Sequence, residues 1–316
     1  MKILVTGGAG FIGSHVVDHY IEAGHEVLVL DNLSTGHREN VHHKAELIVA
    51  DLCDHDRTSD VLERFRPRLV NHHAAQIDIR RSVAEPVFDV NVNVTATVNL
   101  LQSAVRSGVE GVLFASSGGA IYGETPAPVE EQAPKAPISP YGAAKAAVEG
   151  YLFAYAHTFG LKSLSLRYGN VYGPRQDPTG EAGVVAIFSR AMLSGTQPTI
   201  YGSGAQLRDY VCVEDVARAN LLATDRLFSE TALPSTPDDG AYNIATGAST
   251  SVNDLFALLK EVIGFDGEAA YADPRTGELM ESRLGVGKAS RTLSFQAQIP
   301  FSEGLSRTVE WIRSAR

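Results

Sequence analysis

A glycine-rich turn near the start of the chain constrains the fold more than any other feature of the sequence. The apolar run KILVT at 2–6 leads into GGAGFIG at 7–13, and apolar residues then recur at helical spacing as far as Tyr20. The glycines fit both G-x-G-x-x-G and G-x-x-G-x-x-G, and they are Gly7, Gly8, Gly10 and Gly13. Such a turn lets backbone N–H groups reach a pyrophosphate at the start of a helix. The pattern predicts a strand–turn–helix unit that binds a dinucleotide; the alternative is a glycine-rich turn that binds nothing.

The next apolar run ends in a carboxylate. Residues 26–30 read EVLVL and predict a second strand, and Asp31 follows it, 18 residues after Gly13. A carboxylate at the end of this strand can bind both hydroxyls of a ribose, and it repels a 2′-phosphate. The sequence therefore favours NAD over NADP as the cofactor.

Short apolar runs and helical patterns alternate along the first half of the chain. Strands are predicted at 2–6, 26–30, 46–50, 68–71, 111–115 and 162–167. Beyond the first helix, further helices are predicted at 57–66, 87–106 and 140–159. This alternation is typical of a parallel, doubly wound sheet with helices on both faces. The predicted fold class is α/β, of the Rossmann type.

The regular alternation of predicted strands and helices ends after about residue 170, where loops rich in glycine and proline separate the helical patterns. Helices are predicted there at 182–194, 213–228, 252–263 and 302–313. We interpret residues 1–168, with returning segments near 211–245, as the NAD-binding domain. Residues 169–210 and 246–316 are then a smaller α/β lobe for the substrate.

Composition and charge exclude several classes of partner. The net charge is −10, which argues against a basic surface for nucleic acid. No apolar run approaches the roughly 18 residues of a membrane span, and the start of the chain lacks the pattern of a signal peptide. Cys53 and Cys212 have neither a metal spacing nor a disulfide framework. The sequence therefore predicts a cytoplasmic protein that needs no metal, nucleic acid or membrane.

A tyrosine and a lysine lie four residues apart at the start of the helix predicted at 140–159. Tyr141 and Lys145 form Y-x-x-x-K, and this spacing places both side chains on one helix face. A free tyrosine, with a pKa of about 10, is a poor base at neutral pH. A nearby ammonium and a positively charged nicotinamide ring would stabilise the tyrosinate and lower that pKa. The pair predicts proton transfer beside a nicotinamide; the alternative is an ordinary surface pair.

Polar residues follow the predicted strands at the edge where a cofactor would lie. The fifth strand runs into SSGG at 116–119, and a serine hydroxyl there would relay a substrate proton beside the tyrosine. Asp51 and Leu52 follow the third strand, where the adenine usually lies. After the fourth strand, the crevice that the cofactor must cross is expected at His73, Ala74, Ala75 and Gln76. The alternative for His72 and His73 is a pair of strand-end residues without a chemical role.

These residues together resemble the extended short-chain dehydrogenase/reductase superfamily, and within it the chain is similar to the UDP-glucose 4-epimerases. The similarity extends over nearly the whole chain. Its motifs are TGGAGFIGSH at 6–15, DNLSTG at 31–36, SSGGAIYGE at 116–124, SPYGAAKAAVE at 139–149, LRYGNVYGPRQ at 166–176, RDYVCVEDVA at 208–217 and YNIATG at 242–247. The middle motifs are specific to members that act on sugar nucleotides. The resemblance implies an isomerase with tightly bound NAD that interconverts UDP-glucose and UDP-galactose.

The resemblance also assigns roles to single residues. The implied catalytic set is Ser117, Tyr141 and Lys145. The implied cofactor contacts are Gly7, Gly10, Phe11, Ile12, Gly13, Asp31, Asn32, Ser34, Thr35, Gly36, Asp51, Leu52, His73, Ala74, Ala75, Gln76, Asn91, Tyr141, Lys145 and Tyr168. The implied substrate contacts are Ser117, Asn170, Arg208, Arg275, Glu278 and Ser282. The two arginines would bind the diphosphate; the alternative is a pair of solvated surface side chains.

Two positions depart from the pattern of many of these epimerases. Their serine commonly lies five residues before the glycine of the YG pair, and that count falls on Gly118 here. The string SSGGA resembles a subgroup in which Ser117 would be the active-site hydroxyl, and Ser116 is the alternative. The family position that gates acyl-amino sugars falls near Ser282. A small residue there predicts that UDP-N-acetylhexosamines also fit.

The implied reaction is reversible C4 epimerisation through transient oxidation to a 4-keto sugar. Sister enzymes, the 4,6-dehydratases and uronate decarboxylases, commonly carry further acid–base groups after the active-site hydroxyl, where this chain has Gly118, Gly119 and Ala120. An epimerase of another nucleotide sugar, such as a UDP-uronate or a CDP-hexose, stays an alternative. A non-catalytic, NAD-sensing regulator would keep the glycine turn but has no reason to keep Tyr141 with Lys145.

The resemblance further implies a homodimer. Relatives often pair through the helices that correspond to about 87–106 and 141–159, which form a four-helix contact. Apolar faces on these helices could equally belong to an ordinary core.

Overall fold

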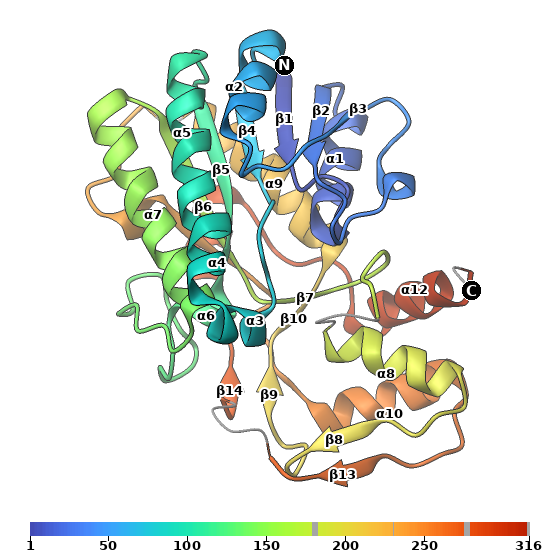
Figure 1. The fold of residues 1–316 in the computed structure, drawn as a ribbon. Coiled ribbons are helices and arrows are strands. Elements are labelled where there is room, and N and C mark those ends of the chain that lie inside the picture. Colours follow the sequence, from blue (N-terminus) through green and yellow to red (C-terminus); the bar gives the residue numbers. More distant parts are fainter. Residues whose placement is uncertain (179–182, 230, 275–278, 315–316) are drawn as a thin grey trace.

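A parallel sheet lies at the centre of the computed structural model, which describes residues 1–178, 183–229, 231–274 and 279–314 (Figure 1). Neighbouring strands in this sheet are all parallel. In spatial order they are β11 (Ala241–Ile244), β6 (Lys162–Tyr168), β5 (Gly111–Ser117), β4 (Leu69–His72), β1 (Lys2–Thr6), β2 (Glu26–Asp31) and β3 (Glu46–Val49). The direction of winding reverses between β1 and β4, the place where open α/β sheets bind ligands. The predicted doubly wound α/β fold is confirmed.

Helices cover both faces of the sheet, so the strands carry nearly continuous apolar runs. One face packs against α2 (His55–Phe65), α5 (Ala96–Arg106) and α7 (Pro140–Phe159). The other packs against α1 (Phe11–Glu22), α9 (Val213–Ser229) and α11 (Gly287–Leu293). Figure 1 shows α5 and α7 side by side in front of the sheet.

Local signals fix the two ends of α7. Pro140 occupies its first turn, and the hydroxyl of Ser139 accepts from the backbone N–H of Gly142 over 3.1 Å. Gly160 ends the helix in the left-handed region, with a φ of 70°. The helix therefore has the bounds that the sequence predicts.

The helix predicted at 87–106 is interrupted by a π turn. After α3 (Ile79–Ala84), the chain continues through α4 (Pro86–Val90), the π turn η2 (Asn91–Thr95) and α5. Asn93 lies in this turn, is buried, and makes two hydrogen bonds with the backbone of Gln76. A contact to a distant loop thus accompanies the local change in helix type, and π turns are frequent at functional sites.

A second group of elements lies at one end of the sheet (Figure 1). Its helices α8 (Val184–Leu193), α10 (Val252–Ile263) and α12 (Phe301–Ser314) share an apolar core. Its strands pair as β7 (Asn170–Tyr172) with β10 (Tyr210–Cys212), β9 (Leu207–Arg208) with both β12 (Thr250–Ser251) and β14 (Glu281–Ser282), and β8 (Thr199–Tyr201) with β13 (Ala270–Ala272). The remaining short helices are η1 (Arg38–Asn40), α6 (Gly118–Ile121) and η3 (Pro237–Gly240). The division into two lobes at the stated boundaries stays a prediction.

Among the residues that the structure describes, no helix combines the length and the apolar character needed to cross a membrane.

Candidate active site

The turn between β1 and α1 requires glycine at two positions. Gly7 has a φ of +70°, and a Cβ there would lie 2.6 Å from the backbone nitrogen of Ala74. A Cβ at Gly13 would lie 2.2 Å from the carbonyl oxygen of Gly7. Helix α1 starts directly after Gly10 without a side-chain cap from any described residue. Its first N–H groups are thus available to an anion, as a pyrophosphate site requires.

Asp31 lies beside this turn at the end of β2. It is 7% exposed, and its two carboxylate oxygens accept from the backbone N–H groups of Ala9 (3.0 Å) and Leu33 (2.8 Å). Nearby, Asn32 donates to Asp51 over 2.9 Å. The structure thus brings together the residues predicted after β2 and β3, with Leu52 and Gly36 buried and Asn32, Ser34 and Thr35 exposed. This cradle fits the adenosine end of a dinucleotide.

The segment after β4 is hydrogen-bonded to the π turn η2. The backbone N–H of Gln76 donates to Asn93 over 2.8 Å, and the Asn93 amide donates back to the Gln76 carbonyl over 2.9 Å. The Gln76 side chain donates to the buried carboxylate of Asp89 over 3.0 Å. Asn91, the predicted cofactor contact, is exposed on the same turn. Asn93 was not predicted as a site residue, although a polar residue on the apolar face of a helix is a signal for such a role.

His73 and Tyr168 form a stacked pair beside the switch point. Their ring centroids are 6.1 Å apart, and the His73 Nε2 lies 3.1 Å from the Tyr168 hydroxyl. That hydroxyl also accepts from the amide of buried Asn220 over 2.9 Å. Burial lowers the pKa of His73 to about 3, so its imidazole is neutral near pH 7. The neighbouring His72 bridges the hydroxyls of Thr6 and Thr97 inside the protein.

Ser117, Tyr141 and Lys145 meet at the carboxyl end of β5. Ser117 and Tyr141 line the same cavity, and the Ser117 hydroxyl is near enough to act on the pKa of Tyr141. Lys145 is buried, donates to the carbonyl oxygen of Ala115 over 2.8 Å, and its Nζ lies 5.6 Å from the centroid of the Tyr141 ring. The predicted i,i+4 pair therefore does lie on one helix face, turned toward the end of the sheet.

The two serines at the end of β5 have different surroundings. Ser116 is 3% exposed and donates to the carboxylate of Glu149 over 2.7 Å. Ser117 is half-buried, and it lies near enough to Tyr141 to act on the pKa of the phenol. This geometry favours Ser117 over Ser116 as the hydroxyl nearest to a substrate.

Burial raises the pKa of Tyr141 in the polypeptide alone. Burial is the largest cause; Ser117 opposes it, and the charge of Asp89 adds to it, for a value of about 12. Burial also lowers the pKa of Lys145 to about 8, against the charges of Asp89 and Glu149. The expected lowering of the tyrosine pKa by the ammonium together with a nicotinamide charge stays a prediction. The positive charge of a nicotinamide would have to supply the difference.

A cavity of about 490 Å³ extends from these residues into the second group of elements. At one end it is lined by Phe11, Ile12, Ile77, Ser117, Tyr141 and Tyr168. At the other end it is lined by Phe188, Ile200, Tyr201, Gln206 and Arg208. The cavity thus connects the proton-transfer groups to a cation.

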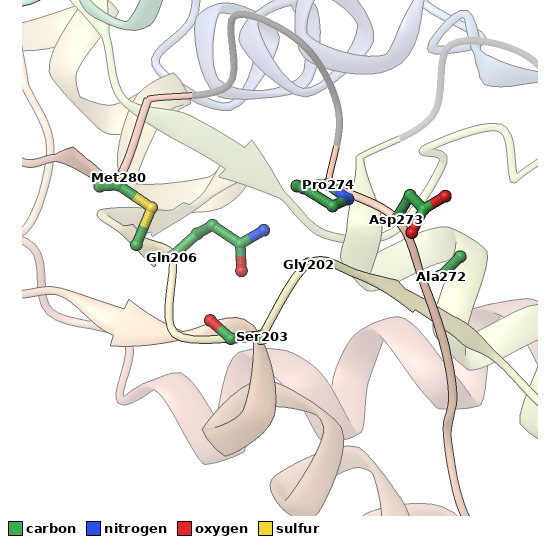
Figure 2. A pocket seen from close by; sticks show the side chains of 7 residues that line it. All are labelled: Gly202, Ser203, Gln206, Ala272, Asp273, Pro274 and Met280. Carbon is green, nitrogen blue, oxygen red and sulfur yellow. The ribbon is translucent and has the colours of Figure 1, made fainter.

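A second cavity, of about 460 Å³, lies between the loop after β8 and the loop after β13 (Figure 2). Gln206 lines both cavities. In Figure 2 its amide lies between Met280 on one side and Pro274 and Asp273 on the other. The two cavities are therefore neighbours that share Gln206 in their linings.

Of the predicted substrate residues, Ser117, Asn170 and Arg208 line the first cavity. Asn170 lines the first cavity, and its backbone N–H donates to the Asp209 carbonyl over 2.8 Å. Ser282 on β14 is the register partner of Arg208 on β9, half-buried and outside the residues that line either cavity. Arg275 and Glu278 lie outside the described residues.

Sequence reasoning also missed a buried ion pair behind the site. Arg167 is fully buried in β6, where Glu149 of α7 binds it with both carboxylate oxygens. The signal was present, because an arginine inside the otherwise apolar strand LSLRY needs a buried partner.

These features together define a class of protein. A Rossmann sheet, an obligatory glycine turn, a carboxylate after β2 and a Tyr–Lys pair next to a strand-end serine are the parts of an extended short-chain dehydrogenase/reductase. Proteins of this class use a nicotinamide cofactor for hydride transfer.

Comparison with known proteins gives the family. The pattern of the NAD-dependent epimerase/dehydratase family matches residues 3–245, and the chain belongs to this family. It is 43% identical to a UDP-glucose 4-epimerase of Mycolicibacterium smegmatis, over 99% of each chain. A structure of the Thermotoga maritima UDP-glucose 4-epimerase with UDP-glucose superposes with a TM-score of 0.94, at 46% identity over 100% of this chain and 99% of that one. A UDP-N-acetylglucosamine 4-epimerase from Methanobrevibacter ruminantium, solved with UDP-N-acetylmuramic acid, has a TM-score of 0.91 at 36% identity, over 100% and 99%. The resemblance stated from the motifs is thereby confirmed.

Proposed function

We propose that the protein catalyses the reversible C4 epimerisation of a UDP-hexose, UDP-glucose or UDP-galactose, through transient oxidation at C4. The observation that carries this proposal is one cavity that is lined by Ser117 and Tyr141 and also by Arg208. A sugar on a diphosphate needs proton transfer at one end and a cation at the other. Family membership and the similarity to UDP-glucose 4-epimerases support the same activity.

The residues present fit NAD as the cofactor. Side chains at Gly7 and Gly13 would fill the turn that faces the pyrophosphate, and Asp31 favours a ribose without a 2′-phosphate. When bound there, NAD would supply reversible hydride transfer at the sugar C4. We propose that the cofactor stays tightly bound throughout, since no net oxidation occurs.

In the proposed mechanism Tyr141 takes the proton of the C4 hydroxyl, directly or through Ser117. Lys145 holds the tyrosinate by its charge and would hold the nicotinamide ribose. Asn170 and Arg208 anchor the diphosphate while the 4-keto sugar rotates within the cavity and presents its other face. Tyr141 then returns the proton to the other epimer. The protein thus supplies position and proton control.

The space after β5 supports epimerisation over the sister reactions. Dehydration or decarboxylation calls for further acid–base groups there, and the residues at 118–120 are Gly118, Gly119 and Ala120, which carry none. A purely NAD-sensing protein would have no use for the buried Lys145 next to Tyr141.

The proposal is tested by incubating the purified protein with UDP-galactose without added cofactor. We expect UDP-glucose to accumulate, measured by NMR, without release of NADH. No conversion, even with NAD added, would contradict the proposal and direct the assay to UDP-N-acetylglucosamine and UDP-glucuronate.

Substrate range is proposed to depend on Ser282. Ser282 on β14 is in register with Arg208 on β9, which lines the first cavity. Ser282→Tyr is expected to lower kcat/KM for UDP-N-acetylglucosamine at least about ten-fold and to spare UDP-galactose, because a ring beside Arg208 would crowd the larger acyl-amino sugar. The measurement is kcat/KM for both substrates, with Ser282→Ala as the control that should keep both. Equal losses for the two sugars in the tyrosine variant would contradict this role.

A homodimer formed through α4, α5 and α7 is a further proposal. Apolar side chains are exposed there, with Val87 at 72%, Val90 at 45% and Tyr151 at 43%. Val87→Glu is expected to convert a dimer into a monomer in sedimentation equilibrium, because a buried, unpaired charge opposes association. The control Leu233→Glu changes an exposed residue in a loop (47%) and should leave the mass unchanged. A wild-type monomer would contradict the proposal.

A place in galactose metabolism and a cytoplasmic location are proposed with this function. Both described cysteines, exposed Cys53 and buried Cys212, are free thiols, which suits a reducing compartment.

A further inference from the structure

A buried ion pair lies directly behind the contact between Ser117 and Tyr141. Arg167 on β6 is 0% exposed and Glu149 on α7 is 2% exposed. The guanidinium donates from Nε to one carboxylate oxygen over 3.0 Å and from Nη2 to the other over 2.6 Å. A bidentate pair of this kind fixes the relative position of the two elements that carry it. Because burying both charges is costly, such a pair is weak evidence for stability and calls for another role.

Glu149 also holds the strand that carries the active-site serine. The hydroxyl of Ser116 donates to the carboxylate over 2.7 Å. Ser116 and Arg167 are register partners across β5 and β6, and the next pair in the register is Ser117 with Tyr168. One carboxylate therefore joins α7 to both strands at the end of β5, where Ser116 and Ser117 both line the cavity.

Spacing along α7 links this contact to the proton-transfer groups. Tyr141, Lys145 and Glu149 follow one another at intervals of four residues, so they lie along one face of the helix. Lys145 donates to the carbonyl oxygen of Ala115 over 2.8 Å. Helix α7 is thus bound to the end of β5 at two successive turns, and Tyr141 extends from the turn before them toward Ser117.

Further contacts keep Arg167 itself in place. Nη1 donates to the hydroxyl of Tyr122 and to the carbonyl of Glu131, each over 2.8 Å. Nη2 also donates to Asp238 over 2.6 Å, and Asp238 accepts from Lys135 as well. The guanidinium therefore has three hydrogen-bond partners besides Glu149, namely Tyr122, Glu131 and Asp238. Movement of the Glu149 carboxylate would break several charge-assisted bonds at once.

We propose that Glu149 is a positioning residue for epimerisation, which sets the distance between the Ser117 hydroxyl and the Tyr141 oxygen by binding Ser116 and Arg167 together. Glu149 has no contact with substrate in this account; it acts through the elements that it joins. The inference rests on the proposed function, because its readout is the proton and hydride transfer step. A displacement of about 1 Å at such a contact can cost about a hundred-fold in rate.

The test uses the holoenzyme with its bound NAD. Ser116→Ala removes the bond between β5 and Glu149 with little change in volume and is expected to lower kcat about ten-fold at unchanged KM. The matched control is Ser165→Ala, a buried serine (5% exposed) on β6 two residues before Arg167. The control should change the melting temperature by a similar amount and keep the wild-type kcat.

A kinetic isotope effect separates positioning from general loss of structure. With substrate deuterated at C4, the effect on kcat should be larger for Ser116→Ala than for the wild type, because a misplaced base makes the chemical step slower than product release. Glu149→Gln, which keeps length and loses charge, should lower kcat further with the same isotope signature.

Three results would overturn the inference or its basis. Wild-type kcat in folded Ser116→Ala contradicts the inference, whether or not Glu149→Gln folds. Equal losses of kcat in Ser116→Ala and Ser165→Ala contradict it too, because only a general structural role would produce them. A wild-type protein without epimerase activity would instead contradict the proposed function, and the inference with it.

Discussion

Replacing Tyr141 with phenylalanine is expected to lower kcat about a thousand-fold while the protein stays folded and keeps its NAD. Removing a general base typically costs about a hundred- to ten-thousand-fold, and no second described residue at the end of β5 offers an equivalent group. The phenyl ring keeps the packing of a residue that is half-buried, and only the hydroxyl is lost. The measurements are kcat for UDP-galactose and the NAD released on denaturation.

Tyr151→Phe is the matched control for this prediction. Tyr151 belongs to the same helix, is 43% exposed and lies away from the cavity lining. We expect wild-type kcat in the control. A Tyr141→Phe enzyme with more than about a tenth of wild-type activity would show that another group transfers the proton.

Replacing Lys145 with methionine is expected to make the nucleotide-free protein more stable and far less active. Burial lowers the pKa of Lys145 from 10.5 to about 8, so the charged form is disfavoured in the folded state. At about 1.4 kcal/mol per pKa unit, this costs about 3 kcal/mol of stability at neutral pH. The cost is complete below about pH 8 and disappears as the pH rises toward 10.5, because folding then requires no loss of a proton.

Methionine keeps the length of the side chain but loses the hydrogen bond to Ala115. We therefore expect a gain of about 2 kcal/mol in the free energy of unfolding at pH 7, measured with urea, and a smaller gain at pH 10. kcat should fall about a hundred-fold or more, since the tyrosinate loses its counter-charge. A variant that is both active and less stable at pH 7 would contradict the account of Lys145.

The sequence predicts those parts of the fold that local signals determine. Ser139, Pro140 and Gly160 mark both ends of α7, and the glycine turn marks the start of α1. By contrast, β5 extends two residues beyond its predicted end, because pairing with β6 continues as far as Tyr168. The π turn at Asn91–Thr95 is likewise tied to a distant partner, the backbone of Gln76.

The sequence could predict those contacts of the candidate site that residue spacing alone determines. An i,i+4 spacing puts Tyr141 and Lys145 together whatever surrounds them. The choice between Ser116 and Ser117 could not be made this way, because it depends on which one meets the carboxylate of Glu149. The rise of the Tyr141 pKa in the polypeptide alone was also out of reach, since desolvation depends on how the helix packs against the sheet.

The central claim, epimerisation by oxidation and return of the same hydride, is tested most directly by following deuterium. UDP-galactose deuterated at C4 would be mixed with unlabelled substrate carrying a carbon label, and the UDP-glucose formed would be analysed by mass spectrometry. The account predicts that deuterium stays at C4 of the molecules that brought it, without exchange with water. Loss of deuterium to solvent, or its transfer to the carbon-labelled molecules, would contradict a cycle in which bound NAD holds the hydride while Tyr141 controls the proton.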